Sequence, residues 1–190
     1  PNAAAMKVDA QSRLLWRFPP RRLEAEPLRD CILAVTGKLD LTMGGPGFSL
    51  FEANNNYVRV YNPKTEFETG DFRRMIYWSK PRMRLDDTFG VFDCPDAGQV
   101  QPKRTRSTTP LQALSLLNSP FLVQQSEAFA ERVKHERSDV SSQVARAFEL
   151  VFQRQPTAEE QSSALALVKN DSLETLCRAL LNANEFLYVF

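Results

Sequence analysis

The sequence predicts a mainly α-helical protein, a compact antiparallel helical bundle with a small β-hairpin or short sheet inserted at about residues 57–92. Two observations predict this class. The chain from residue 107 onward carries five helix start signals, each followed by apolar residues at helical spacing. Between residues 57 and 92 that spacing fails, and short runs of aromatic and β-branched residues take its place. We expect a single domain over residues 1–190, in which residues 1–106 (a helix plus the small sheet) share a core with a five-helix bundle of residues 107–190.

The first long helix is predicted from Arg21 to about Thr36. Pro20 suits its start, where a missing N–H removes no hydrogen bond, and Gly37 suits its end as a left-handed residue. Its apolar residues follow the i, i+3, i+4, i+7 spacing of one helix face: Leu28, Cys31, Ile32 and Val35. A shorter helix from Asp9 to Trp16 is expected to pack its Leu14, Leu15 and Trp16 against the long one.

Three strands are expected in the middle of the chain: Tyr57–Tyr61, Arg74–Ser79 and Thr88–Phe92. A sharp turn is expected before them, because residues 43–47 contain three of the seven glycines. These strands would form the small sheet.

The five helices expected after residue 107 have recognisable starts. Thr109 and Ser119 each precede a proline, the arrangement of an N-cap and a first helical residue. Thr157 and Glu160 have the spacing of a capping box, and Ser172 is an N-cap for the last helix. The middle helix is expected to run from 140 to 152. The residues expected to be buried on the first and third of these helices are Leu111, Leu114, Leu117, Val144, Phe148 and Val151.

Composition argues against several kinds of site. With 24 basic and 23 acidic side chains the net charge is +1, so nucleic-acid binding is not expected. His135 is the only histidine, and Cys31, Cys94 and Cys177 form no C-x-x-C pair. We therefore expect no catalytic, cofactor-binding or metal-binding residues in this chain. No apolar run reaches the ~20 residues of a membrane span. Cys94, on a predicted turn, is the one thiol that merits a reactivity test.

Charged side chains gather in two stretches, RRLEAEPLRD at residues 21–30 and FDCPDAGQVQPKRTR at residues 92–106. The net charge is 0 over residues 1–72, +4 over 73–106 and −3 over 107–190, which favours pairing within the chain. We expect the two stretches to form one buried or half-buried polar junction between the sheet and the bundle. Its candidate residues are Arg22, Glu26, Arg29, Asp30, Asp93, Asp96, Arg104 and Arg106.

Each stretch also allows another interpretation. In the first stretch, the alternative is that Glu26 and Asp30 form an acid–base pair or bind a hard cation. The flanking arginines favour ionised, paired carboxylates instead. Lys103, Arg104 and Arg106 could hold an anion at the start of the next helix; alternatively, Arg104 or Arg106 could reach back to Asp93 or Asp96.

Several blocks together resemble one known family. They are RLLWR at 13–17, RRLEAEPLRD at 21–30, MGGPG at 43–47, FDCPD at 92–96, RTRSTTPLQAL at 104–114 and LCRALLNANEF at 176–186. The sequence resembles the C-terminal domain of unknown function of large planctomycete proteins that carry cytochrome-c-like domains upstream. The resemblance spans nearly the whole chain, and we expect the start of the family domain to be missing. It implies an exported (periplasmic or extracellular) multidomain protein, with any haem held in an upstream domain, and it implies no defined activity.

These observations lead to one principal functional hypothesis and one alternative. The principal one is a non-catalytic structural or interaction module of such a secreted protein, whose partners are other domains of the same longer chain. The alternative is an extracellular glycan-binding or glycan-degrading unit, with a polysaccharide as partner. Degradation would need two of its acids about 5–10 Å apart. The candidate ligand contacts of the alternative are Asp40, Tyr61, Tyr77 and Trp78, with Asp93 and Asp96 as further acids.

Overall fold

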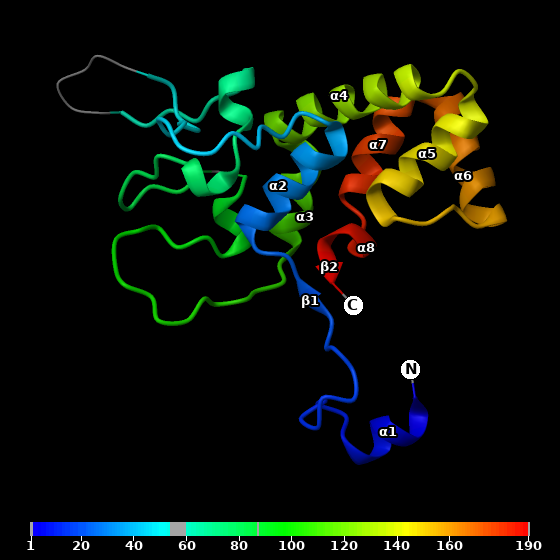
Figure 1. Ribbon diagram of the computed structural model, residues 1–190, viewed down its shortest axis with the longest axis horizontal. Helices are drawn as coiled ribbons and strands as arrows, with labels where there is room; N and C mark the ends of the chain where they lie inside the picture. Colours follow the sequence, from blue (N-terminus) through cyan, green and yellow to red (C-terminus); the bar gives the residue numbers. More distant parts are fainter. Residues whose placement is uncertain (1, 54–59, 87, 190) are drawn as a thin grey trace.

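The computed structural model describes residues 2–53, 60–86 and 88–189. Within them the fold is mainly helical, with a small two-stranded antiparallel sheet, so the predicted fold class is confirmed. Helices α2 to α7 form the body, the loops between α2 and α3 lie to one side of it, and an N-terminal arm stands apart (Figure 1). The elements in chain order are α1 (Ala3–Val8), β1 (Arg21–Arg22), α2 (Ala25–Thr36), the 3-10 helices η1 (Thr69–Phe72), η2 (Met75–Tyr77) and η3 (Gly90–Phe92), α3 (Pro110–Asn118), α4 (Pro120–Glu136), α5 (Val140–Phe152), α6 (Ala158–Asn170), α7 (Leu173–Leu181), α8 (Asn184–Leu187) and β2 (Tyr188–Val189).

The C-terminal helices begin where the sequence predicts, because their first backbone amides are satisfied locally. Ser119 Oγ accepts a hydrogen bond of 3.2 Å from the amide three residues ahead in α4, and Ser172 Oγ accepts one of 3.1 Å in α7. Thr157 and Glu160 form the predicted capping box of α6. Helix α5 spans residues 140–152 as expected, and its Val144, Phe148 and Val151 are buried.

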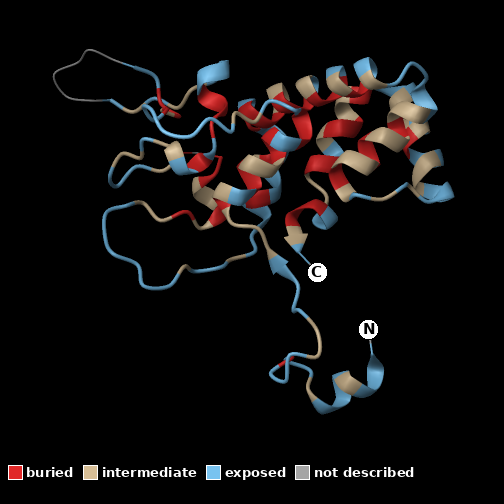
Figure 2. Cartoon of the chain, in the orientation of Figure 1, coloured by how far each residue is buried: buried red, intermediate tan, exposed pale blue. Residues whose placement is uncertain are grey.

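The hydrophobic core surrounds α4 and extends from the helices into the loops beside α2 (Figure 2). Phe121, Phe129 and Val133 of α4 are buried, and so are Cys177 and Leu181 of α7. The same cluster of buried side chains includes the core-facing residues of α2. One core therefore joins the early part of the chain to the late part.

Helix α3 presents a different face to the core from the one predicted. Leu111, Leu114 and Leu117 are exposed, whereas Gln112 and Leu116 are buried. Gln112 Nε2 donates 2.9 Å to the carbonyl oxygen of Val91, and this contact holds the polar side of the helix against η3. The three leucines have the spacing of one helix face, but the buried side-chain amide of Gln112 determines which face turns toward the core.

Helix α2 begins at Ala25, four residues later than predicted, and Arg21–Arg22 form a strand with Tyr188–Val189. Pro27 explains the difference. It is tolerated in the first turn of a helix, whereas in a helix that began at Arg21 its ring would collide with an earlier carbonyl. The predicted end is confirmed, since Gly37 has a left-handed φ of 73°.

The two-stranded sheet pairs Arg21–Arg22 with Tyr188–Val189, and the described part of residues 57–92 holds no such sheet, contrary to expectation. Residues 75–77 and 90–92 are 3-10 helices, so the strands predicted at Arg74–Ser79 and Thr88–Phe92 are wrong. Of the strand predicted at Tyr57–Tyr61, residues 57–59 lie outside the described residues, and residues 60–61 are not in a strand. Backbone pairing here is limited to isolated bridges such as Phe48 with Trp78, and between them side chains bind the backbone: Met75 N donates 2.8 Å to Asp30 Oδ1, for example.

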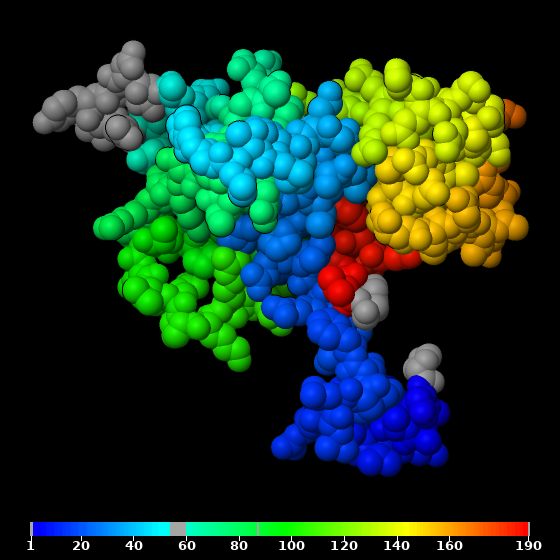
Figure 3. Space-filling view, viewed as in Figure 1, coloured from blue at the N-terminus to red at the C-terminus, as the bar shows by residue number. Residues whose placement is uncertain are grey.

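The N-terminal arm, residues 2–18, folds on itself and stands away from the body (Figure 3). The helix predicted from Asp9 to Trp16 is wrong, because the helix of the arm ends at Val8 and Asp9 organises a turn instead. Asp9 Oδ2 accepts 2.7 Å from the Leu14 amide, and the Asp9 carbonyl accepts 2.7 Å from Trp16 Nε1. Leu14 and Leu15 consequently point into solvent.

Candidate functional site

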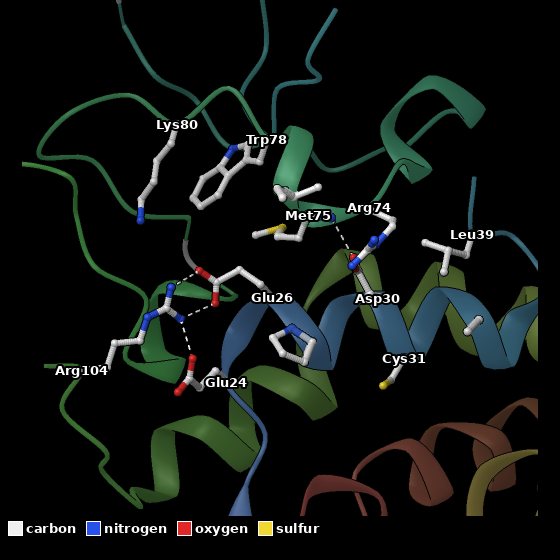
Figure 4. A pocket seen from close by; sticks show the side chains of 13 residues that line it. Glu24, Glu26, Asp30, Cys31, Leu39, Arg74, Met75, Trp78, Lys80 and Arg104 are labelled. Atoms are coloured by element: carbon white, nitrogen blue, oxygen red, sulfur yellow. Dashed lines mark hydrogen bonds and ion pairs between the residues drawn. The ribbon is translucent and has the colours of Figure 1, made fainter. Parts of the chain in front are cut away.

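A polar junction forms where the start of α2 meets the loop that leads into α3. Arg104 of the loop is its centre, with Nη1 at 2.6 Å from Glu26 Oε2 and 2.9 Å from Glu24 Oε2. Arg104 Nη2 donates 2.8 Å to Glu26 Oε1, which makes a two-pronged contact with Glu26 (Figure 4). Such paired hydrogen bonds between charged groups are strong and fix the relative orientation of both side chains.

A second ion pair lies near the first and joins the same two segments. Arg22 Nη2 donates 2.6 Å to Asp93 Oδ2, and the guanidinium lies 4.9 Å from the centre of the Phe92 ring. Asp93 also accepts 2.9 Å from the Ser107 amide and 2.8 Å from the Ser107 hydroxyl. The loop of residues 93–107 is therefore held at both ends.

Arg29 extends the junction into the core, where it is fully buried. Its guanidinium donates 2.8 Å to the Arg73 carbonyl and also to the Asp71 carbonyl. It lies 4.6 Å from the centre of the Phe48 ring. Burial lowers the pKa of Arg29 to about 10, so the group stays charged at neutral pH.

The structure brings together most of the predicted junction residues, in pairings different from those expected. The contacts of Arg22 and Arg104 cross between segments and do not run along one helix face. Arg104 reaches Glu24 and Glu26 and does not contact either aspartate of the loop. Arg106 makes only a weak contact of 3.9 Å with Glu24.

The remaining two predicted junction residues, Asp30 and Asp96, make other contacts. Asp96 accepts 2.9 Å from the Gly98 amide within its own loop. Asp30 lies 3.4 Å from Arg74 Nε, and it accepts from the Met75 amide. Asp30 therefore joins α2 to η2, whereas Asp96 stabilises its own loop and also accepts 2.8 Å from the Met83 amide through its carbonyl oxygen.

A groove of about 740 Å³ runs along α2 beside the junction (Figure 4). One wall is α2, and the other comes from residues 74–80. Its apolar lining consists of Pro27, Cys31, Ala34, Leu39, Met75, Ile76 and Trp78. Its charged lining consists of Glu24, Glu26, Asp30, Arg74, Lys80 and Arg104, three carboxylates and three cations.

The electrostatics of the groove favour fixed charges over proton transfer. Burial acts to raise the pKa of Glu26, but the hydrogen bonds and charge of Arg104 outweigh it, so the pKa lies below its ordinary value. Cys94 lies behind the groove, 3.2 Å from Lys80 Nζ and 3.7 Å from Glu26 Oε1. Its burial and the Glu26 charge raise the pKa of the Cys94 thiol, which keeps it protonated and disfavours the reactivity considered above.

The four predicted ligand contacts do not form one site. Trp78 lines the groove beside α2, whereas Tyr61 lines another hollow of about 560 Å³. Tyr77 binds the Gly44 amide through its hydroxyl at 2.8 Å, and Asp40 accepts 2.8 Å from the Thr42 amide. Both therefore serve the loop that follows α2.

Sequence reasoning missed two residues that organise this region. Glu24 is a partner of Arg104, and its place within the charged stretch of residues 21–30 is the feature that indicates it. Arg73 is buried and donates to the carbonyls of Thr42, Gly44 and Pro46, while its guanidinium lies 3.9 Å from the centre of the Tyr77 ring. No local pattern marks it, because its acceptors are backbone groups about 30 residues earlier.

Two further properties can be stated for the described part of the chain. In residues 2–53, 60–86 and 88–189, no group of three or more His, Cys, Asp or Glu side chains is placed to hold a metal ion. None of the helices in the same ranges has the length and hydrophobicity needed to cross a bilayer.

The fold and the junction define a helical module with a half-buried network of ion pairs beside an apolar groove. The chain belongs to the family described as PSD1, a protein of unknown function (DUF1553), whose match covers residues 1–168. No curated protein and no solved structure matches the chain.

Proposed function

We propose that the chain is a non-catalytic structural or interaction module of a larger exported protein that also carries cytochrome-c-like domains. Its partners in this proposal are other domains of the same longer chain, and any haem is held by an upstream domain. The observation that carries the proposal is the character of the groove beside α2, where the carboxylates are bound to arginines and the remaining lining is apolar except for Lys80.

The charges of the groove are suited to holding the fold. Glu26 is bound by two nitrogens of Arg104, and Asp30 is bound by Arg74 and a backbone amide. A general acid needs a raised pKa, whereas the hydrogen bonds and charge of Arg104 outweigh burial and lower the pKa of Glu26. This supports a role in positioning segments of the chain.

The apolar surface beside the groove is held in place before any partner arrives. Arg73 and the Tyr77 hydroxyl fix the loop of residues 42–46 through its backbone. That loop region nevertheless exposes Leu41 and Met43 by 67% and 88%, and neighbouring η2 exposes Ile76 by 76%. Ordered, exposed apolar side chains next to a groove are typical of a surface that binds another polypeptide.

A thermal-shift panel of sugars, sulfated polysaccharides and divalent metals tests the proposal. A structural module should melt at the same temperature in every condition. A specific ligand present at 100 times its Kd would instead add about 2.7 kcal/mol, which raises the melting temperature by about 5 °C or more. A saturable rise of that size with one of these ligands would contradict the non-catalytic module and favour the alternative.

A glycan-binding unit is the second candidate, and one observation favours it. Trp78 lines the groove, its buried Nε1 has no hydrogen-bond partner among the described residues, and Lys80 Nζ lies 5.2 Å from the ring centre. An indole face beside a cation suits an anionic sugar. In this case Trp78→Ala should abolish a polysaccharide-induced shift, while Tyr61→Ala, in the other hollow, should retain it.

A further inference from the structure

We propose that the groove beside α2 binds a segment of another polypeptide that combines a carboxylate with apolar side chains. The carboxylate lies against Lys80, and the apolar side chains lie along α2. The inference rests on the proposed interaction role of that groove, and it names the chemistry of the partner. Charge complementarity and the arrangement of the apolar lining support it.

The two glutamates of the groove are already paired with arginines. Arg104 binds Glu24 and Glu26 through hydrogen bonds of 2.6 to 2.9 Å. Glu24 also lies 3.7 Å from Arg21 and 3.9 Å from Arg106. An incoming cation would have to compete with these arginines for a carboxylate, so this end of the groove does not favour a basic partner.

Lys80 is the groove cation that no carboxylate of the described residues neutralises. The third carboxylate of the lining, Asp30, lies 3.4 Å from Arg74. Lys80 Nζ instead lies 3.2 Å from the Cys94 sulfur and 5.2 Å from the centre of the Trp78 ring, and Figure 4 shows it beside Trp78 on the wall opposite α2. Burial raises the pKa of the Cys94 thiol and keeps it uncharged. A carboxylate beside this ammonium gains a charge-assisted hydrogen bond.

The basic character continues along the loop that follows Lys80. Arg82 and Arg84 come within four residues, both are exposed, and neither forms an ion pair with a carboxylate of the described residues. The Met83 amide donates 2.8 Å to the Asp96 carbonyl, which holds this segment against the loop of residues 93–107. Positive charge therefore accumulates on the segment that leaves this end of the groove. Such a charge attracts an acidic segment and orients it during the encounter.

The apolar lining of the groove follows one face of α2. Pro27, Cys31 and Ala34 have the i, i+4, i+7 spacing of a single face, which covers about 10 Å along the helix. Leu39 continues this lining at the end away from Lys80 (Figure 4). A stretch of about three extended residues, or about two turns of helix, has the matching length. The groove therefore fits a segment with its acidic residue at one end and apolar residues toward the other.

Apolar surface continues outside the groove, which favours a polypeptide over a small molecule. Ile76 lines the groove and is exposed by 76%, and Leu41 and Met43 of the neighbouring loop are exposed by 67% and 88%. A small ligand that filled the groove would leave most of this surface in water. A polypeptide segment with flanking residues covers the groove and these side chains together.

Selection of a phage-displayed library of random dodecapeptides on the 190-residue chain tests this chemistry. We expect the enriched sequences to combine Asp or Glu with apolar residues. Each enriched peptide is then synthesised and titrated against a Trp16→Phe variant, in which fluorescence reports on Trp78 in the groove. Binding should change that fluorescence saturably, and it should weaken as salt is added, because salt screens the contact with Lys80.

Two variants, each checked for folding by circular dichroism, should weaken binding about tenfold or more. Lys80→Glu reverses the unpaired charge, and Ala34→Glu places a charge on the apolar face of α2. Lys169→Glu, the same change at an exposed position of α6, is the matched control and should bind as the parent does. Peptides in which lysine replaces the acidic residue should bind Lys80→Glu better than the parent, a reversal that a misfolded variant would not produce.

Three results would overturn the proposed partner: no enriched sequences, enriched sequences without an acidic residue, or binding that Lys80→Glu leaves unchanged. The proposed function is judged separately by the thermal-shift panel, which contains sugars and metals and no peptides. A chain that melts alike across that panel and binds no acidic peptide would keep its structural role and lose this partner.

Discussion

Arg29 connects three parts of the molecule through one buried guanidinium. It belongs to α2, it binds the carbonyls of Asp71 and Arg73, and it lies within 5.4 Å of the centre of the Phe121 ring on α4. Burying a cation costs less when its donors are satisfied, and here backbone carbonyls satisfy two of the three guanidinium nitrogens, while Nε has no partner among the described residues. The path of the chain around residues 71–73 therefore depends on this side chain.

Replacing Arg29 should be among the most damaging single changes to the fold. Arg29→Ala leaves two buried carbonyls without donors and opens a cavity, and we expect a loss of about 3 to 5 kcal/mol. Arg29→Lys keeps the charge but cannot reach both carbonyls with the same geometry, so it should be intermediate. Thermal unfolding followed by circular dichroism measures the effect, with the exposed Arg82→Ala as control. Equal melting of Arg29→Ala and Arg82→Ala would refute this role.

The Arg104–Glu26 contact is the corresponding test at the half-buried end of the junction. Arg104→Ala or Glu26→Ala should lower the melting temperature by several degrees, because each removes the two charge-assisted hydrogen bonds between these residues, worth about 1 to 2 kcal/mol after allowance for solvent, and Arg104→Ala also removes the bond to Glu24. Together the two changes should cost less than their sum, because both remove the same contact. The exposed Glu131→Ala serves as control. Unchanged melting in both single variants would show that the junction does not stabilise the fold.

The candidate site was predictable as a set of residues but not as a set of pairs. The density of charged residues at 21–30 and 92–106 identified the two stretches, because dense charges of both signs on a near-neutral chain favour ion pairs within it. The partner of Arg104 is 78 residues away, and nothing in local spacing says whether Glu26 or Asp93 is reached. Which carboxylate each arginine reaches depends on the path of the loop of residues 93–107. That path is in turn fixed by the ion pairs, so sequence spacing does not determine it.

Elements with local causes were predictable, and elements with distant causes were not. Helices α4 to α7 begin at side chains that bind the amide three residues ahead, so sequence spacing suffices. Residues 75–77 have strand-forming side chains, yet they form a 3-10 turn because Asp30 takes the Met75 amide. Tertiary hydrogen bonds override β propensity there.

At the level of elements, the end of α5 is tied to α6 and α8 by Arg154. Its guanidinium binds Glu160 at 2.7 and 2.8 Å, and it binds Glu185 at the same distances. The hydrogen bonds and charge of Arg154 lower the pKa of Glu160 to about 2, and they lower the pKa of Glu185 as well. The folded state therefore binds fewer protons than the unfolded state between about pH 2 and 4.5.

The stability due to this tie should be present above pH 4.5 and lost as the pH falls toward 2. Glu160→Gln removes the titration while retaining the capping box, since glutamine also suits that position. The variant should melt below the parent at neutral pH, and the difference should shrink as the pH approaches 2. Glu159→Gln, an exposed neighbour, is the control. A difference in melting temperature that is constant with pH would exclude this ionisation as the cause.

At the scale of the whole molecule, the early and late parts of the chain share one core and several polar contacts. Thr36 Oγ1 of α2 lies 3.0 Å from Gln125 Oε1 of α4, and Arg132 of α4 donates 2.6 Å to the Val35 carbonyl. The buried side chains of α2 and α4 belong to the same hydrophobic cluster. Neither part can lose its structure without exposing apolar surface of the other.

We therefore expect residues 19–189 to unfold in one cooperative transition, and the positions of the tryptophans allow a direct test. Both tryptophans, Trp16 and Trp78, lie before α3, whereas most of the helical signal in far-ultraviolet circular dichroism comes from α3 to α8. In a Trp16→Phe variant, fluorescence reports on Trp78 alone, beside α2. Its denaturant midpoint should coincide with that of the circular dichroism, the signature of two-state unfolding. A fluorescence transition at lower denaturant would mean that the α2 region and the helical bundle are separate folding units joined only by the junction.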